Sequence, residues 1–146
     1  MKAIIQRVKN ASVVVDGDTV GSVKKGLLLF LGIGINDSRS DAEYLSNKIV
    51  QLRVFEDPHG KMNMSLKDIN GELLVISQFT LYGDCSKGRR PSFTDAMLPH
   101  EAEELYNYFV DLLKNHCHNV QTGIFGAHMD VALINDGPVT FIIESK

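Results

Sequence analysis

The sequence predicts a single α+β domain: a compact, mainly antiparallel, β-barrel-like sheet with two principal helices. About eight short runs rich in β-branched residues are separated by tight turns, which is typical of strands. These runs are grouped along the chain, and only two segments show apolar residues at helical spacing. The 146 residues, 44% of them hydrophobic, are enough to form a core without a disulfide or metal. We therefore expect one domain over residues 1–146.

The first third of the chain is predicted to be strands. Residues 3–8 and 11–15 are rich in β-branched side chains, and residues 16–18 have turn chemistry. Residues 19–23 then return as a hairpin partner. After a second turn at residues 24–26, residues 27–33 form a buried apolar strand. Short strands joined by tight turns favour antiparallel pairing.

Two helices are predicted. Ser40 and Glu43 have the spacing of a capping box at the start of the first. Pro99 suits the first position of the second. The apolar stripes of the two helices consist of Ala42, Leu45, Ile49 and Leu52, and of Ala102, Leu105, Phe109, Leu112 and Leu113.

The remaining segments complete the sheet. Residues 60–71 look like an irregular connection, and residues 73–82 have the strongest strand pattern, followed by a polar loop at 83–93. The chain then closes with strands near residues 120–124 and 129–134, a turn at 135–137, and a strand from 139 to 144.

Charge and cysteine content limit the function classes. The net charge of −3 argues against a general nucleic-acid coat, but it allows a local basic patch. Lys87, Arg89 and Arg90 form such a cluster, which is either a phosphate contact or a solvated loop. Two cysteines are too few for a disulfide framework, and no apolar run approaches the ~20 residues of a membrane span. We expect a cytoplasmic protein without a signal segment or membrane contact.

Neither a metal nor a cofactor is expected. His116, Cys117 and His118, completed by Cys85 or His128, match no zinc-ligand spacing. Histidines near the end of a helix also suit the helix dipole. The glycine pattern over residues 32–37 lacks the third glycine of a dinucleotide-binding loop.

Two segments are unusual for their surroundings. Ser77, Gln78 and Thr80 place three polar residues in four positions of an apolar run. They form either a half-exposed edge strand or a strand end whose N–H groups and hydroxyls line a pocket. Residues 135–138 read as a hairpin turn, but Pro138 has no N–H for a strand ladder. The backbone of Gly137 and Pro138 is then free for another role, and their peptide bond is of the type that can be cis.

Together these segments resemble a known family. Residues 77–84, SQFTLYGD, and residues 135–141, NDGPVTF, look like the two signature motifs of the D-aminoacyl-tRNA deacylases, the D-tyrosyl-tRNA deacylase family. The opening residues Gln6, Arg7 and Val8 match that family too. The resemblance covers essentially the whole chain, and no motif position departs from the pattern.

The resemblance implies a function. The expected enzyme is a homodimer with two active sites at the subunit interface. It hydrolyses the ester that joins a D-amino acid, or glycine, to the 3′-terminal adenosine of tRNA. It rejects L-aminoacyl-tRNA, and so proofreads chirality in translation.

The resemblance also assigns roles to residues. Ser77, Gln78, Phe79 and Thr80 would form the catalytic pocket floor, with N–H groups around Phe79 and Thr80 polarising the scissile carbonyl. Met129 would line the pocket wall. In the partner's pocket, the carbonyl oxygens of Gly137 and Pro138 would meet the substituents of the substrate α-carbon, with Arg7 holding their segment.

Other mechanisms and functions remain open at this point. The 2′-hydroxyl of the tRNA would help to activate water or stabilise charge. The rival is a Thr80 nucleophile, which lacks an evident adjacent base. A non-enzymatic RNA-binding or protein-binding module would explain the basic loop but not the paired motifs. An ordinary esterase or amidase using Thr80 is a third reading.

Overall fold

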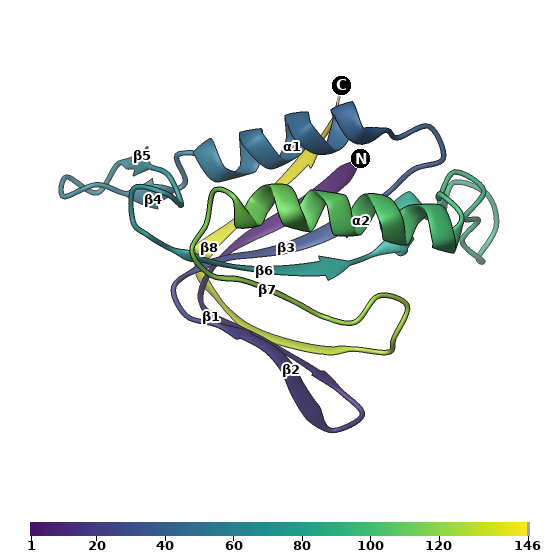
Figure 1. The fold of residues 1–146 in the computed structure, drawn as a ribbon, viewed down its shortest axis with the longest axis horizontal. Coiled ribbons are helices and arrows are strands. Elements are labelled where there is room, and N and C mark those ends of the chain that lie inside the picture. Colours follow the sequence, from purple (N-terminus) through teal and green to yellow (C-terminus); the bar gives the residue numbers. More distant parts are fainter. Residues whose placement is uncertain (146) are drawn as a thin grey trace.

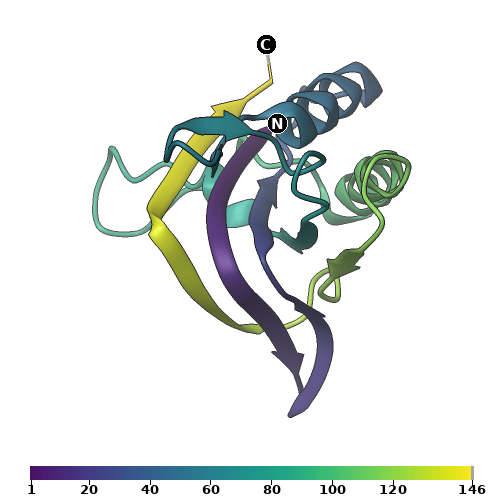
Figure 2. The same ribbon diagram turned by 90° about the vertical axis from the view of Figure 1, so that its left-hand side faces the viewer.

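A long, strongly bent strand organises the sheet. The computed structural model describes residues 1–145. Strand β1 pairs with β2 and β3 along one edge and with β8 along the other, all antiparallel. The sheet continues from β3 to β6 and β7, and it curls into a nearly closed barrel shape (Figures 1 and 2). The strands of this sheet are β1 (Lys2–Val15), β2 (Asp18–Val23), β3 (Gly26–Gly32), β6 (Glu72–Ser77), β7 (Val120–Thr122) and β8 (Asp130–Glu144).

The predicted fold class is confirmed, with one refinement: the sheet is mixed. Strands β3 and β6 are parallel, and so are β6 and β7. Each parallel pair is joined by a connection that contains a helix, as parallel neighbours require. The helices are α1 (Arg39–Gln51) and α2 (Pro99–Lys114), and both lie over the same face of the sheet (Figure 1).

The helices bury their predicted apolar stripes. Leu45, Ile49 and Phe109 are fully buried in the larger core cluster between the helices and the sheet. Pro99 is the first residue of α2, as predicted. No helix within residues 1–145 combines the length and the apolar character needed to cross a membrane.

The predicted start of the first helix is wrong by two residues. Its capping box is formed by Ser38 and Asp41, not by Ser40 and Glu43. The N–H of Ser38 donates to the Asp41 carboxylate at 2.9 Å. Ser38 has the extended backbone of an N-cap, whereas Ser40 already lies inside the helix.

Residues 135–137 do not form the predicted hairpin turn. The chain continues in the same direction, so the two predicted strands are one strand, β8, with a bulge opposite Gln6 and Val8. The side chain of Asn135 bridges the bulge: Val139 N–H donates to its Oδ1 at 2.7 Å, and its Nδ2 donates to Thr140 Oγ1 at 3.1 Å. This side-chain bridge takes the place of the main-chain bonds of a turn. Residues 3–8 and 11–15 are likewise joined in the single strand β1.

The predicted strand over residues 73–82 ends early. Strand β6 stops at Ser77, and a 3₁₀ helix, η1 (Phe79–Tyr82), follows. The neighbouring strand β3 also ends here, and the last bond between the two runs from Gln78 N–H to the Leu31 carbonyl at 2.8 Å. The segment predicted as irregular contains β5 (Met62–Met64), which pairs with β4 (Phe55–Glu56) in a small second sheet.

Candidate active site

A cavity of about 560 Å³ opens where β6 ends. Its wall combines the ends of β3 and β6, the first residue of η1, the start of α2, and the loop at residues 125–129. Most of the lining is apolar. The lining residues include Ser77, Gln78, Phe79, Phe93, Ala96, Leu98, His128 and Met129.

The structure brings four of the predicted site residues to this cavity. Ser77, Gln78 and Phe79 line it from the end of β6, and Met129 lines it from the loop before β8. Met129 is held there because its sulfur occupies the space that a side chain at Gly123 would take. Thr80 follows in η1 but is not part of the lining.

Two main-chain donors at this position have no acceptor. The first N–H groups of a helix cannot bond within it, and Phe79 and Thr80 are the first residues of η1. Across residues 1–145, neither N–H donates to a protein acceptor. The cavity edge therefore carries two adjacent N–H groups that are free to bind an oxygen atom of a ligand.

The Thr80 hydroxyl is engaged by an amide. Its Oγ1 accepts a hydrogen bond from Nε2 of Gln78. Within the described chain it has no bond to a histidine or a carboxylate, the groups that activate a hydroxyl nucleophile. His128 also lines the cavity, which sequence reasoning did not predict, and its exposed imidazole lies 3.7 Å from the Asp130 carboxylate.

The second motif lies beside the middle of β1, between the positions opposite Gln6 and Val8. The Gly137–Pro138 peptide bond is cis, and Gly137 has a φ of +152°. Arg7, only 6% exposed, donates from Nε to the Asp136 carbonyl and from Nη1 to the Val54 carbonyl, both at 2.8 Å. The buried guanidinium thus ties the bulge of β8 to the chain that follows α1.

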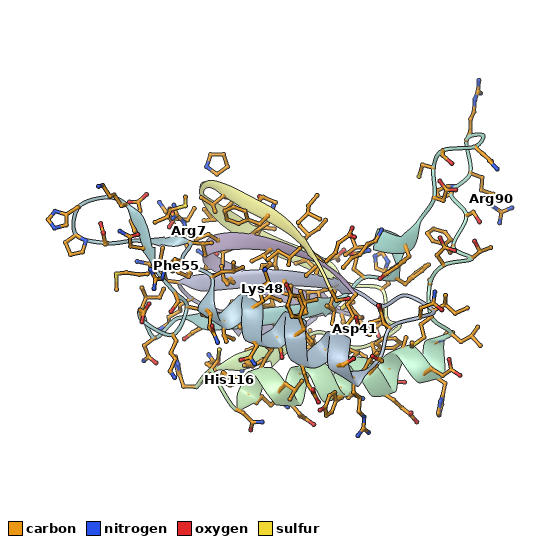
Figure 3. All side chains as sticks on the ribbon, turned by 90° about the horizontal axis from the view of Figure 1, so that it is seen from above. Arg7, Asp41, Lys48, Phe55, Arg90 and His116 are labelled. Atoms are coloured by element: carbon orange, nitrogen blue, oxygen red, sulfur yellow. The ribbon has the colours of Figure 1, made fainter. Side chains whose placement is uncertain are left out.

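One chain does not bring the two motifs together. Arg7 is opposite Leu27 in β3, whereas the cavity residue Leu31 is opposite Ala3, four residues further along. That separation is about 13 Å along the strand. In Figure 3, Arg7 lies far from the loop that carries Arg90, which extends from the opposite side of the molecule.

Strand β8 is an open edge. It pairs with β1 alone among the strands of residues 1–145, and its outward side chains include Ile134, Phe141 and Ile142, the last 72% exposed. An uncovered edge strand is able to pair with another chain, and an exposed apolar patch is typical of an interaction surface.

The predicted basic cluster projects beside the cavity. Lys87, Arg89 and Arg90 are exposed, and none of them forms an ion pair with another described residue. Two main-chain hydrogen bonds between Asp84 and Ser92, at 2.8 and 3.0 Å, close the base of the loop that carries these three residues. The loop extends away from the body of the protein (Figure 3).

The cysteine and histidine residues do not assemble into a metal site. Cys85 is exposed in the loop, whereas Cys117 lies just beyond the end of α2. Over residues 1–145, no three His, Cys, Asp or Glu side chains are arranged to hold a metal ion.

The chain is similar to proteins of one family over its full length. Residues 4–144 match the family model described as D-Tyr-tRNA(Tyr) deacylase. It is 60% identical to a D-aminoacyl-tRNA deacylase of Clostridium acetobutylicum and 58% identical to one of Thermosipho africanus. Each alignment covers 100% of this chain and 98% of the relative.

Two solved structures share the fold. One, titled c-Myc DNA Unwinding Element Binding Protein, is 42% identical with a TM-score of 0.95, and the match covers 100% of this chain and 99% of the other. The second is titled as a probable eukaryotic D-amino acid tRNA deacylase. It is 15% identical with a TM-score of 0.85 over 98% of both chains, a likeness that concerns the fold alone.

Proposed function

The chain belongs to the D-Tyr-tRNA(Tyr) deacylase family and is a D-aminoacyl-tRNA deacylase, and we propose that its active site is built mainly from main-chain atoms. The reaction is hydrolysis of the ester between a D-amino acid and the terminal adenosine of tRNA. The observation that carries the proposal is the pair of unbonded N–H groups of Phe79 and Thr80 at the cavity edge.

These two N–H groups activate the ester carbonyl, which is the electrophile of the reaction. The ester carbonyl oxygen accepts hydrogen bonds from them, and the bonds strengthen as negative charge develops on that oxygen. Removing one such donor from a hydrolase typically costs about 10²–10³ in kcat, so a pair of them accounts for a large rate enhancement. Ser77 and Gln78 complete the floor of the pocket beneath the substrate.

Water is the nucleophile in this proposal. The Thr80 hydroxyl accepts a bond from the Gln78 amide, which has no capacity to remove its proton. The 2′-hydroxyl of the terminal adenosine lies next to the scissile ester in any aminoacyl-tRNA, where it helps to activate water or to stabilise charge. The protein therefore needs neither a metal nor a cofactor for this step.

The substrate's chirality is read by a second copy of the chain. We place the carbonyl oxygens of Gly137 and Pro138 from one subunit in the cavity of its partner. Their distance from their own cavity and the open apolar edge of β8 support this arrangement. The homodimer then has two active sites at its interface. Arg7 fixes the segment through its bond to the Asp136 carbonyl.

Selectivity follows from a clash with a backbone oxygen. A hydrogen on the α-carbon fits beside a carbonyl oxygen, whereas the side chain of an L-amino acid collides with it. Glycine has no side chain and is therefore accepted. Because the side chain of a D-amino acid points elsewhere, the enzyme accepts a broad range of D-amino acids and proofreads chirality in translation.

The basic loop binds the acceptor end of the tRNA. Lys87, Arg89 and Arg90 have no intramolecular ion-pair partners in the part of the chain that the structure describes, so phosphates are their natural ligands. Since aminoacyl-tRNA is used in translation, we place the activity in the cytoplasm.

The test is release of free amino acid from D-tyrosyl-tRNA, L-tyrosyl-tRNA and glycyl-tRNA carrying matched tRNA. We expect hydrolysis of the first and third and none of the second above the uncatalysed rate. A matched control is the triple variant Lys87→Ala, Arg89→Ala, Arg90→Ala, which should be slower on D-tyrosyl-tRNA with the same discrimination. Equal hydrolysis of D-tyrosyl-tRNA and L-tyrosyl-tRNA would contradict the proposed filter.

A further inference from the structure

An exposed pair of aromatic rings borders the cavity on the side of the basic loop. Phe79 is 58% exposed and Phe93 is 38% exposed, and their ring centroids are 4.9 Å apart at an interplanar angle of 61°. Both rings line the cavity, as does Leu98, which is 66% exposed. Single exposed apolar side chains are ordinary, but three of them around one opening form a patch.

The rings of this pair are held in position. A side-chain carbon added at Gly83 would lie 2.9 Å from Cε1 of Phe93, so the ring packs directly on the backbone of residue 83. The Asp84–Ser92 bridge fixes the chain immediately before Phe93. Phe79 belongs to η1 and contacts Phe93 edge to face. A fixed aromatic surface binds another ring without first losing side-chain entropy.

Charge indicates what kind of molecule covers the patch. The loop between Asp84 and Ser92 carries Lys87, Arg89 and Arg90, which have no ion-pair partners within residues 1–145. A ligand that contacts both the rings and the loop therefore combines flat aromatic groups with negative charge. Single-stranded nucleic acid has this chemistry, and proteins bind it with aromatic side chains beside basic grooves.

We propose that Phe93, supported edge to face by Phe79, stacks on the base of the nucleotide that precedes the terminal adenosine of the tRNA. This inference rests on the proposed function, which places the aminoacyl ester over the N–H groups of Phe79 and Thr80. The strand then leaves the cavity over the aromatic pair toward the basic loop. The pair binds the single-stranded end, and the loop binds its phosphates.

The test compares a substrate that has this nucleotide with one that lacks it. The substrates are D-tyrosyl-adenosine and a D-tyrosyl minihelix ending in CCA, with the wild type, Phe93→Leu and Phe93→Tyr. Phe93→Leu keeps an apolar side chain but removes the aromatic face. It should lower kcat/KM for the minihelix about 5- to 50-fold more than kcat/KM for D-tyrosyl-adenosine. Phe93→Tyr keeps the aromatic face and should match the wild type on both substrates.

Three outcomes would overturn the inference. An equal loss of kcat/KM on both substrates would place the Phe93 ring in the pocket for the aminoacyl-adenosine. An unchanged kcat/KM on both would show that the rings do not contact the substrate. A change in sedimentation of Phe93→Leu would show that the rings contact a second copy of the chain. Failure of the wild type on both D-substrates would instead contradict the proposed function itself.

Discussion

Arg7 Nε donates to the main-chain carbonyl of Asp136 at 2.8 Å, so a buried cation in β1 fixes the bulge of β8. The same guanidinium donates to the Val54 carbonyl and lies 3.7 Å from the Glu56 carboxylate. The bulge that carries Gly137 and Pro138 is thereby tied to the small β4–β5 sheet. The position of the proposed chirality filter depends on this side chain.

Replacing Arg7 with methionine should destabilise the fold. The change keeps the length of the side chain but leaves the Val54 and Asp136 carbonyls without their donor, at a cost of about 2–4 kcal/mol. Urea unfolding measures the loss. Arg7→Lys is the control, because it keeps the charge but lacks the planar guanidinium that reaches both carbonyl oxygens. Its free energy of unfolding should lie between those of the wild type and Arg7→Met. Unchanged stability in Arg7→Met would show that the carbonyls find other donors.

Thr80→Ala should retain appreciable deacylation. The hydroxyl is bonded to the Gln78 amide, and the proposed catalytic groups at this position are N–H groups, which alanine keeps. Single-turnover hydrolysis of D-tyrosyl-tRNA gives the rate, and Thr80→Ser serves as the matched control. If Thr80→Ala loses all turnover while it still folds and binds tRNA, and Thr80→Ser remains active, the hydroxyl is the nucleophile.

The triple variant Lys87→Ala, Arg89→Ala, Arg90→Ala should bind tRNA more weakly. Each phosphate contact that is lost reduces the slope of log affinity against log salt by about 0.7–0.9. Affinity measured at several salt concentrations therefore separates phosphate contacts from an effect on the fold. Lys24→Ala with Lys25→Ala, in the β2–β3 turn, removes two exposed positive charges elsewhere on the surface and is the comparison. An unaltered slope in the triple variant would mean that the loop does not contact phosphates.

Asp57 makes the stability of the β4–β5 hairpin depend on pH. Bonds from Lys61 N–H, the Asn63 amide and His59 N–H lower the pKa of its carboxyl below the usual value. Its stabilising effect is therefore complete above the pKa of the unfolded chain and is lost as the pH falls through the lower, folded value. The difference in unfolding free energy between the wild type and Asp57→Ala should shrink below about pH 4. A difference that stays constant to lower pH would contradict this role.

The sequence predicted features that depend on a few neighbouring residues, such as the start of α2 and the turn before β2. Pro99 begins α2 because a first helical residue needs no N–H donor. The turn at Asp16 and Gly17, before β2, is formed as expected. The bulge in β8 was mistaken for a turn because an asparagine, an aspartate and a glycine in a row are typical of turns. Only tertiary structure shows that the Asn135 side chain bridges the bulge while both halves of β8 pair with β1.

The site was only partly predictable for the same reason. Ser77, Gln78, Phe79 and Met129 meet at one cavity, and the three polar residues in positions 77–80 were a signal for a strand end. The aromatic partner Phe93 had no signal in the sequence. Sequence periodicity continues past Ser77, whereas the ladder stops there because β3 ends alongside.

Gly137→Ala should remove deacylation of D-tyrosyl-tRNA. An added Cβ would lie 2.6 Å from Cγ2 of Val139, and a φ of +152° is strained for any residue with a side chain. The bulge must therefore change shape, and the two carbonyl oxygens move with it. In the proposed site these oxygens also contact the α-carbon of a D-substrate, so their displacement misplaces the ester relative to the N–H groups of Phe79 and Thr80. Activity is measured beside sedimentation, so that a dimer with a distorted bulge is distinguished from a separated one. A dimeric Gly137→Ala with wild-type rate and D/L discrimination would place the filter elsewhere.

Mixing two inactive subunits tests most directly whether the filter acts across the dimer. One subunit carries Gly137→Ala and keeps its cavity, and the other carries Ala96→Trp, which fills the cavity but keeps its filter. Each variant alone should be inactive. In a co-expressed equal mixture, half of the dimers are mixed and each has one complete site, so about a quarter of the wild-type rate on D-tyrosyl-tRNA should return. A mixture no more active than its two components would show that Gly137 and Pro138 do not complete the partner's site.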